Sequence, residues 1–274
     1  MQKCNLCPNQ CSVNRQNELG YCKSFENLKI ANSWKWFAHV RYLAWVEPSK
    51  IPEKLTVLPY VYFEDACWYI KNTGQYHFAA KGGHNAEPHN HNDLGSFILA
   101  DDEKQILADF GCGNYCKQYF WFKTRYDFLV NSSRGHSVPI LDGEYQHVGE
   151  EFSAKVIECT EDMFKLDLSN AYESGKKVIR SFEMQESGIK ITDEFSDSKF
   201  TERFATYTEP VLKEGKVLLD SFEMQYDSNA FSVSVIPDSY EAHGYSGIVK
   251  DVYFVDFTPV SDNVKTFETA IVRK

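Results

Sequence analysis

Short runs in which apolar and polar residues alternate, separated by turn-forming residues, cover most of the chain after residue 55. A period of two is typical of a β-strand with one buried face, because successive side chains on a strand point to opposite sides. Asp101–Lys104 indicates a hairpin, and Asp142-Gly143 indicates a tight turn. Strands are predicted at residues 57–63, 66–70, 76–80, 96–100, 105–108, 154–159, 164–168, 177–182, 189–195, 217–219, 231–236 and 252–257.

The regular spacing of these runs predicts an all-β fold, an antiparallel β-sandwich of two large stacked sheets. Two such sheets use roughly 200 residues as one domain, so we expect residues 55–274 to form it. Residues 1–54 are expected to be a short N-terminal segment that is Cys-rich at first and aromatic afterwards. Within it, Trp34–Trp45 predicts one amphipathic helix that ends near Pro48.

Charge and composition exclude several classes of function. The 274 residues carry a formal net charge of -10, so we expect no nucleic-acid partner and no attraction to an anionic membrane surface. The chain contains no apolar stretch of about eighteen residues, so no transmembrane helix is predicted. Its start, Met-Gln-Lys-Cys, is followed by no apolar signal-peptide core. These features predict a cytoplasmic protein, or one that has lost its leader.

Four cysteines near the start have the spacing of a metal site. In a chain without a secretory signal, closely spaced thiols are more typical of metal ligands than of disulfides. Either a zinc ion or an iron–sulfur cluster would suit four thiolates, and reduced thiols without a metal are the alternative. The four candidates are Cys4, Cys7, Cys11 and Cys22.

The sequence around these cysteines resembles the Cys-rich leader of radical SAM proteins that are related to glycyl-radical activating enzymes. The resemblance covers residues 1–32 only. The three-cysteine motif that would hold the catalytic cluster in those proteins is absent here. We therefore infer no radical chemistry from it.

Three of the eight histidines, His84, His89 and His91, lie within eight residues of one another. So many polar groups are unfavourable to bury unless a metal or a substrate satisfies them. His89 and His91 are two apart, which would place both rings on one face of a strand. Asp109 ends a predicted strand and His136 precedes another. Two histidines and a carboxylate from three neighbouring strands would make a zinc site with an open fourth position.

Three motifs in this region, taken together, resemble the C-terminal β-sandwich domain of heparinase II/III-like polysaccharide lyases. The resemblance covers about residues 55–270. The motifs agree in order, spacing and chemistry, which is more specific than any one of them. They are Gly82-Gly-His84 with His89-Asn-His-Asn-Asp-Leu-Gly-Ser-Phe97, Leu107-Ala-Asp-Phe-Gly111 with Tyr115 or Tyr119 after it, and Arg125 with Ser133-Arg-Gly-His-Ser-Val138.

The resemblance implies a structural zinc ion held by His91, Asp109 and His136. It also implies that His89 faces the sugar and takes part in β-elimination at a uronic acid. In that reaction a base removes the C5 proton and an acid protonates the leaving glycosidic oxygen. The zinc would fix the loops that hold His89.

The implied partner is an acidic polysaccharide or oligosaccharide. Arg125, Arg134 and Tyr115 are the candidates for contacting it, because guanidinium groups pair well with carboxylates. Ordinary surface ion pairs are the alternative for the two arginines. Full-length members of the family carry a helical toroid before the sandwich, and it supplies a catalytic Tyr and Asn. No segment here matches it, so we expect a truncated relative, one that acts with a helical partner, or a homo-oligomer.

Two alternatives to the lyase remain. The first is a non-catalytic carbohydrate-binding or structural sandwich with a bound zinc. The second is a cupin-like metalloenzyme, although the glutamate expected after His91 is missing. We expect three further histidines, His77, His147 and His243, to be ordinary surface or core residues.

Overall fold

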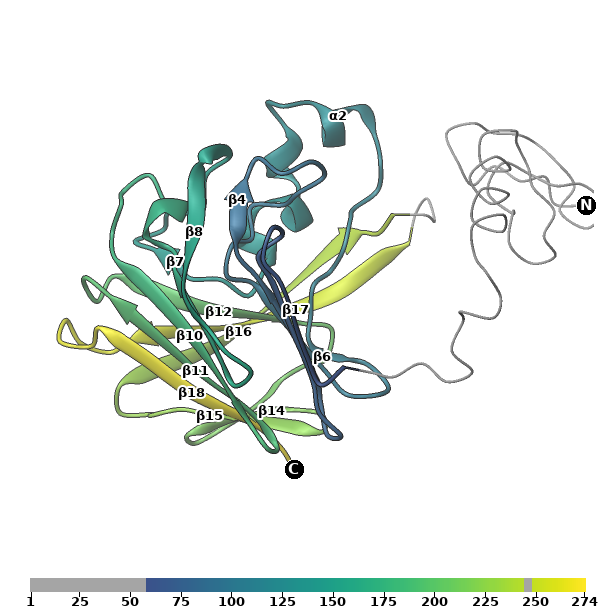
Figure 1. Ribbon diagram of the computed structural model, residues 1–274. Coiled ribbons are helices and arrows are strands. Elements are labelled where there is room, and N and C mark those ends of the chain that lie inside the picture. Colours follow the sequence, from purple (N-terminus) through teal and green to yellow (C-terminus); the bar gives the residue numbers. More distant parts are fainter. Residues whose placement is uncertain (1–57, 244–247) are drawn as a thin grey trace, which may run out of the picture. The chain divides into compact units, whose positions relative to one another are not determined.

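The computed structural model describes residues 58–243 and 248–274, and these form three antiparallel β-sheets (Figure 1). The predicted all-β fold is confirmed. The four N-terminal cysteines and the predicted aromatic helix lie outside the described residues. No helix in the described part of the chain is long and apolar enough to cross a membrane.

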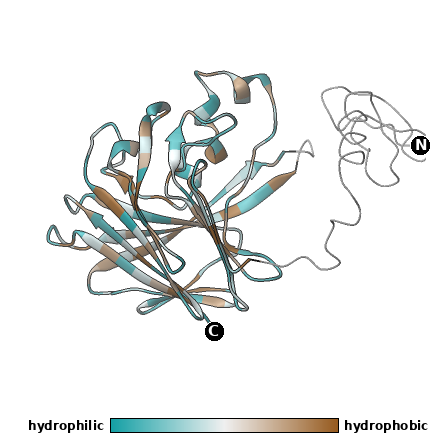
Figure 2. Cartoon of the chain, in the orientation of Figure 1, coloured by the Kyte–Doolittle hydropathy of each residue, from teal (hydrophilic) through white to brown (hydrophobic). Residues whose placement is uncertain are grey.

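The largest sheet has nine strands and forms one layer of the sandwich. Its central strands carry the alternation of apolar and polar residues that the sequence predicts (Figure 2). In spatial order the strands are β13 (Val211–Lys213), β14 (Lys216–Leu219), β15 (Phe222–Gln225), β18 (Thr266–Arg273), β11 (Gly188–Phe195), β10 (Val178–Gln185), β9 (Met163–Asp167), β8 (Gly149–Cys159) and β4 (Gly83–Asn85).

Two smaller sheets make up the rest of the strand structure. One has five strands in the order β1 (Tyr60–Phe63), β2 (Trp68–Asn72), β3 (His77–Lys81), β5 (Phe97–Ala100) and β6 (Gln105–Leu107). The other has four strands in the order β16 (Phe231–Glu241), β17 (Val249–Pro259), β12 (Phe200–Thr206) and β7 (Ile140–Leu141).

The two smaller sheets meet where β6 lies beside the end of β12, beyond the short pairing of β12 with β7. The backbone N–H of Ala108 donates to the carbonyl of Ala205 at 2.8 Å. The hydroxyl of Thr206 donates to the carbonyl of Ile106 at 2.8 Å. The predicted second layer is therefore split into two sheets that remain hydrogen-bonded to each other.

An aromatic core joins all three sheets. Phe182 of the nine-stranded sheet lies 5.2 Å, between ring centroids, from both Phe78 and Phe97 of the five-stranded sheet. Phe97 in turn lies 6.1 Å from Phe204 of the four-stranded sheet. All four rings are buried. Fully burying one such side chain stabilises the fold by about 1.5–3 kcal/mol, so the layers cannot separate without a large loss of stability.

Both predicted turns are present. The N–H of Asp101 donates to the carbonyl of Lys104 at 3.0 Å, which closes the hairpin between β5 and β6. Asp142 and Gly143 have φ values of 52° and 82°. Positive φ at both central residues is typical of a type I′ turn, and explains the Asp-Gly pair.

The connection between β6 and β7 holds short helical turns that the strand pattern did not predict. They lie at one end of the sandwich, beside β4 (top of Figure 1). Their bounds are α2 (Lys117–Phe120), η2 (Arg125–Asp127), η3 (Leu129–Asn131) and η4 (Ser133–Gly135), and a further turn, η5 (Ser169–Ala171), follows β9. His136 comes directly after η4, so this connection delivers a predicted site residue.

Candidate metal centre and cleft

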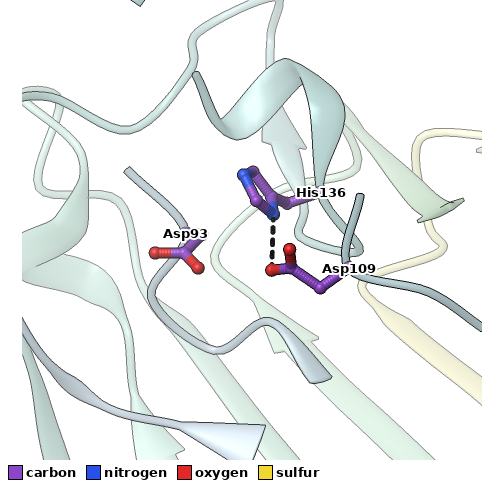
Figure 3. Close-up of side chains that lie close together, drawn as sticks. All are labelled: Asp93, Asp109 and His136. Atoms are coloured by element: carbon purple, nitrogen blue, oxygen red, sulfur yellow. Dashed lines mark ion pairs between the residues drawn. The ribbon is translucent and has the colours of Figure 1, made fainter. Parts of the chain in front are cut away.

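Three side chains able to bind a metal converge where the loop after β4, the end of β6 and the end of η4 meet. They are Asp93, Asp109 and His136, and one ligand atom from each lies within 4.8 Å of the other two. Figure 3 shows the imidazole pointing toward Asp109, with Asp93 beside it. Two carboxylates and an imidazole are ligands that suit zinc and related divalent ions.

His136 is fully buried, and its two ring nitrogens have different surroundings. Nε2 lies 2.9 Å from the carbonyl oxygen of Val130, which can only accept a hydrogen bond, so Nε2 carries a proton. Nδ1 faces Oδ2 of Asp109 at 3.5 Å and has no hydrogen-bond partner. A buried polar atom without a partner is costly. In the neutral ring, Nδ1 offers a lone pair, which is what a metal ion requires.

Asp109 and His136 shift each other's pKa. Burial lowers the pKa of His136, but the neighbouring Asp109 carboxylate outweighs burial and raises it to about 8. Burial raises the pKa of Asp109, yet His136 and the N–H of Gly111, which donates at 2.7 Å, hold it well below its usual range. In the metal-free protein a proton on His136 therefore partly takes the place of a metal cation.

His91 lies beside this cluster. Its ring centroid is 5.4 Å from that of His136. Burial, and then the charge of His136, lowers the pKa of His91 to about 4. The ring is therefore neutral at pH 7, as a metal ligand must be. The set predicted from the sequence, His91, Asp109 and His136, thus lies together, but its role in binding a metal stays a prediction.

Two residues at this site, Asp93 and Lys81, were not among the predicted metal ligands, although Asp93 belongs to the polar stretch that was singled out. Asp93 is buried and takes the place that the prediction gave to His91 within the group of converging atoms. Lys81, at the end of β3, donates to Oδ1 of Asp93 at 2.8 Å. Asp93 closes the same polar stretch as the histidines, which is a signal that could have identified it. Lys81 carries no such signal, because only the folded sheet places it beside Asp93.

A cleft of about 490 Å³ leads to the cluster over the outer face of the five-stranded sheet. Asp93 and Asp109 lie in its lining together with His89 and His91. The expectation that the two histidines share a face of a strand is wrong, because residues 86–95 form a loop. His89 is exposed and has a φ of 64°, a left-handed conformation in which histidine is enriched. The loop nevertheless brings both rings to the same cleft.

The other predicted contact residues lie outside that lining. Nη2 of Arg125 donates to the carbonyl of Asn90 at 2.7 Å, so this arginine holds the loop of the two histidines. Nη2 of Arg134 donates to the carbonyl of Asp127 at 3.0 Å. Tyr115 is 40% exposed and packs near α2. Contact between these three side chains and a substrate stays a prediction.

Gln146 joins the two segments that carry the site. Its side-chain amide makes two hydrogen bonds of 2.8 Å with the backbone N–H and carbonyl of Leu94, next to Asp93. Its own backbone N–H donates to the hydroxyl of Ser133 at 2.9 Å, three residues before His136. The buried amide of Gln146 thus makes the pair of backbone hydrogen bonds that a neighbouring strand would otherwise make to Leu94. It thereby fixes the position of Asp93.

Arg180 makes a second link from the core of the nine-stranded sheet. Its Nη1 donates to the carbonyl of Gly95 at 3.0 Å and to the carbonyl of Ser137 at 2.8 Å. These carbonyls follow the loop of the histidines and His136, respectively. One fully buried guanidinium therefore holds both sides of the cluster.

Two further histidines, His84 and His77, make local contacts. Nδ1 of His84 accepts from the N–H of Ala86 at 3.2 Å. The ring of His77 lies 2.9 Å from Oδ1 of Asn72 and 3.0 Å from Oδ1 of Asp102. Neither histidine lies in the lining of the cleft.

Comparisons with known proteins agree with this architecture. The family described as "Heparinase II/III-like, C-terminal" matches residues 56–235. No curated protein matches the chain. The large sheets are also unlike the small barrel expected for a cupin, so we set that alternative aside.

Several solved structures share the fold. A heparan sulfate lyase from Pedobacter heparinus has a TM-score of 0.63 at 16% identity, over 87% of this chain and 41% of that one. A heparinase III has a TM-score of 0.64 at 16% identity, over 88% of this chain and 40% of that one. This chain therefore spans about two fifths of the length of these structures. By its family match over residues 56–235, the chain belongs to the heparinase II/III-like C-terminal domain family.

Proposed function

We propose that this protein acts on a uronic-acid-containing polysaccharide by β-elimination, with a structural zinc ion in its β-sandwich. The observation that supports this most is the cleft in which His89 lies beside the Asp93, Asp109 and His136 cluster. The solved structures of similar fold include proteins named as heparan sulfate lyases. A heparan-type glycosaminoglycan is therefore the first substrate to test.

The reaction needs proton transfer at two atoms of the substrate. The C–H bond at C5 of the uronate breaks, its electrons form the C4–C5 double bond, and the glycosidic oxygen at C4 leaves with a proton. Imidazole is the side chain most often used for such transfers. His89 is the exposed histidine of the cleft lining, so we assign proton transfer to it. A helical partner would supply the second proton-transfer group, and in the chain alone water would take that role at a lower rate.

The chain's own residues fit a zinc ion. Nδ1 of His136 is buried without a hydrogen-bond partner, Asp109 is held ionised, and His91 or Asp93 completes the set. When bound, zinc would supply a fixed positive charge between the loop of His89, the end of β6 and the end of η4. Because His91 is two residues from His89, a zinc ion bound by His91 would also fix the position of the catalytic ring of His89.

The test is the ultraviolet absorbance of the unsaturated uronate that elimination creates. Heparan-type and alginate-like polysaccharides are incubated with wild type, His89→Ala and His77→Ala. We expect absorbance to rise with wild type and His77→Ala, and to rise about 100-fold more slowly with His89→Ala, the range typical of a lost general acid or base. Equal rates for His89→Ala and wild type would contradict the assigned role.

A non-catalytic carbohydrate-binding sandwich is the second candidate. It is favoured by one observation, that the chain spans only about two fifths of the lyases of similar fold. Calorimetric titration with uronate oligosaccharides separates the two functions. Binding without any rise in absorbance would identify a binding module, whereas turnover would identify the lyase.

A further inference from the structure

Three outward side chains form a row across the first three strands of the five-stranded sheet. Phe63 of β1 lies directly opposite Trp68 of β2, and Trp68 lies directly opposite Lys81 of β3. Residues opposite each other in antiparallel strands project from the same face. Strands are about 4.8 Å apart, so the row from Phe63 to Lys81 is about 10 Å long.

The row leads into the cleft of the candidate metal centre. Trp68 and Lys81 both lie in the lining of that cleft, together with His89. At the inner end of the row, Lys81 donates to Asp93, a member of the metal-binding cluster. Trp68, His89 and the carboxylates of the candidate metal centre are therefore parts of one continuous surface.

Both aromatic rings of the row are exposed. Phe63 is 52% exposed and Trp68 is 49% exposed. A single exposed aromatic residue is ordinary. Two adjacent ones beside a polar cleft match the usual composition of a ligand site, in which aromatic surface is combined with a few placed polar groups.

A sugar ring fits this surface chemically. One face of a pyranose presents several C–H groups, and the face of an aromatic ring carries the negative part of its quadrupole, which attracts positively polarised hydrogens. An ammonium group has three donors, and the side chain of Asp93 takes one from Lys81. The others suit a carboxylate or sulfate group on the same sugar chain.

We propose that Trp68, with Phe63 beside it, is a stacking platform for a sugar ring of an acidic oligosaccharide, and that Lys81 pairs with an anionic group of that oligosaccharide. This inference rests on the proposed function, because it adds a binding subsite to the same cleft. The platform would hold the chain while the next unit lies against His89.

The chain offers a matched control. Trp121 is 49% exposed, the same fraction as Trp68, but it follows α2 and is not part of the cleft lining. Truncating Trp121 removes the same amount of exposed indole from the protein. A general effect of losing a surface tryptophan will therefore appear in both variants, whereas loss of a subsite will appear only at Trp68.

The experiment is calorimetric titration of a heparan-type tetrasaccharide into the full chain, with folding checked by circular dichroism. We expect Trp68→Ala to raise the dissociation constant about tenfold, which is the upper range for the loss of one aromatic contact. Trp68→Phe should stay within about threefold of wild type, and Trp121→Ala should match wild type. If Trp68→Ala does not fold, Trp68→Gln replaces it, with the same expected loss.

The outcomes separate this inference from the proposed function. Wild-type binding that is unchanged in Trp68→Ala, or lost equally in Trp121→Ala, would overturn the platform and leave the proposed function standing. Failure of wild type to bind any uronate oligosaccharide would overturn both. Binding that depends on Trp68 but yields no unsaturated product would support the platform and contradict the lyase activity alone.

Discussion

This sandwich contains two clusters of buried charge, and their charges are balanced in different ways. The clusters are neighbours, because Arg180 of the first donates to the carbonyls of Gly95 and Ser137 beside the second. In the first, Arg180 makes a two-bond contact with Asp193 at 2.9 and 2.8 Å and a bond of 2.7 Å with Glu202. All three side chains are fully buried. Burial, and then the charge of Asp193, raises the pKa of Glu202 well above its usual range. One guanidinium therefore faces about one full negative charge, and the cluster is internally neutral.

In the second cluster the balancing charge comes from a proton on His136 and from Lys81 rather than from a buried guanidinium. Asp93 and Asp109 bring two carboxylates together, and Lys81 pairs with Asp93 alone. Nδ1 of His136 is left without a hydrogen bond. Each cluster holds one buried atom without a hydrogen-bond partner, Oε1 of Glu202 in the first and Nδ1 of His136 in the second. The first cluster is closed to solvent, whereas Asp93 and Asp109 of the second line a cleft. This contrast indicates that the first cluster serves the fold and the second serves a ligand.

Breaking the first cluster should have the largest effect on stability. Arg180→Met leaves Asp193 and Glu202 buried without their partner, and removing one member of a buried ion pair costs about 3–5 kcal/mol. Lys216→Met is the control, because its ion pair with Glu223 lies at the surface and should be worth less than about 1 kcal/mol. The free energy of unfolding in urea measures both. Similar losses in the two variants would contradict the structural role of Arg180.

Loosening the support of the second cluster should affect the metal more than the fold. Gln146→Leu removes both hydrogen bonds to the backbone of Leu94. We expect zinc affinity to fall about 10- to 100-fold, as for other side chains that position metal ligands. Competition with a chelating dye measures this affinity, and Gln118→Leu, at an exposed position of α2, is the control. Affinity within twofold of wild type would contradict the positioning role.

The smallest effect is the pH dependence of the metal-free protein. The pKa of His136 is raised to about 8, so its contribution to stability is present below pH 6.5 and is lost as the pH rises through 8. The pKa of His91 is lowered to about 4, so stability falls between pH 6.5 and 4 as the unfolded chain takes up the proton first. The melting temperature should therefore decline on both sides. Zinc should remove the alkaline decline, because a metal-bound His136 has no proton to lose at Nδ1. An alkaline decline that persists with zinc would contradict ligation by this ring.

Most of the fold could be predicted from the sequence, because a β-strand with one buried face has apolar residues at every second position. β10 and β11 were found in this way. β12 was missed because it is buried along almost its whole length yet contains Glu202 and Arg203. These charges are tolerated only because Arg180 and Asp256 pair with them in the folded protein. Sequence alternation cannot show a partner that lies 22 or 53 residues away.

The same limit applies to the candidate site. His91, Asp109 and His136 could be selected because their residue types and spacing carry chemistry, and the fold brings them together. Lys81 and Gln146 could not, because neither stands in a motif. Their roles come from β3 and from the turn after β7 passing beside the loop of the histidines. Tertiary contacts, which the sequence pattern does not contain, decide both.

The most direct measurement is elemental analysis of the purified full chain as wild type, Asp109→Asn and Cys4→Ser. Asp109→Asn keeps the shape of the side chain and removes the charge that faces His136. We predict zinc in wild type and in Cys4→Ser, and its loss from the sandwich in Asp109→Asn. Equal zinc in wild type and Asp109→Asn, with loss in Cys4→Ser, would place the metal in the N-terminal segment and contradict a zinc site at His91, Asp109 and His136.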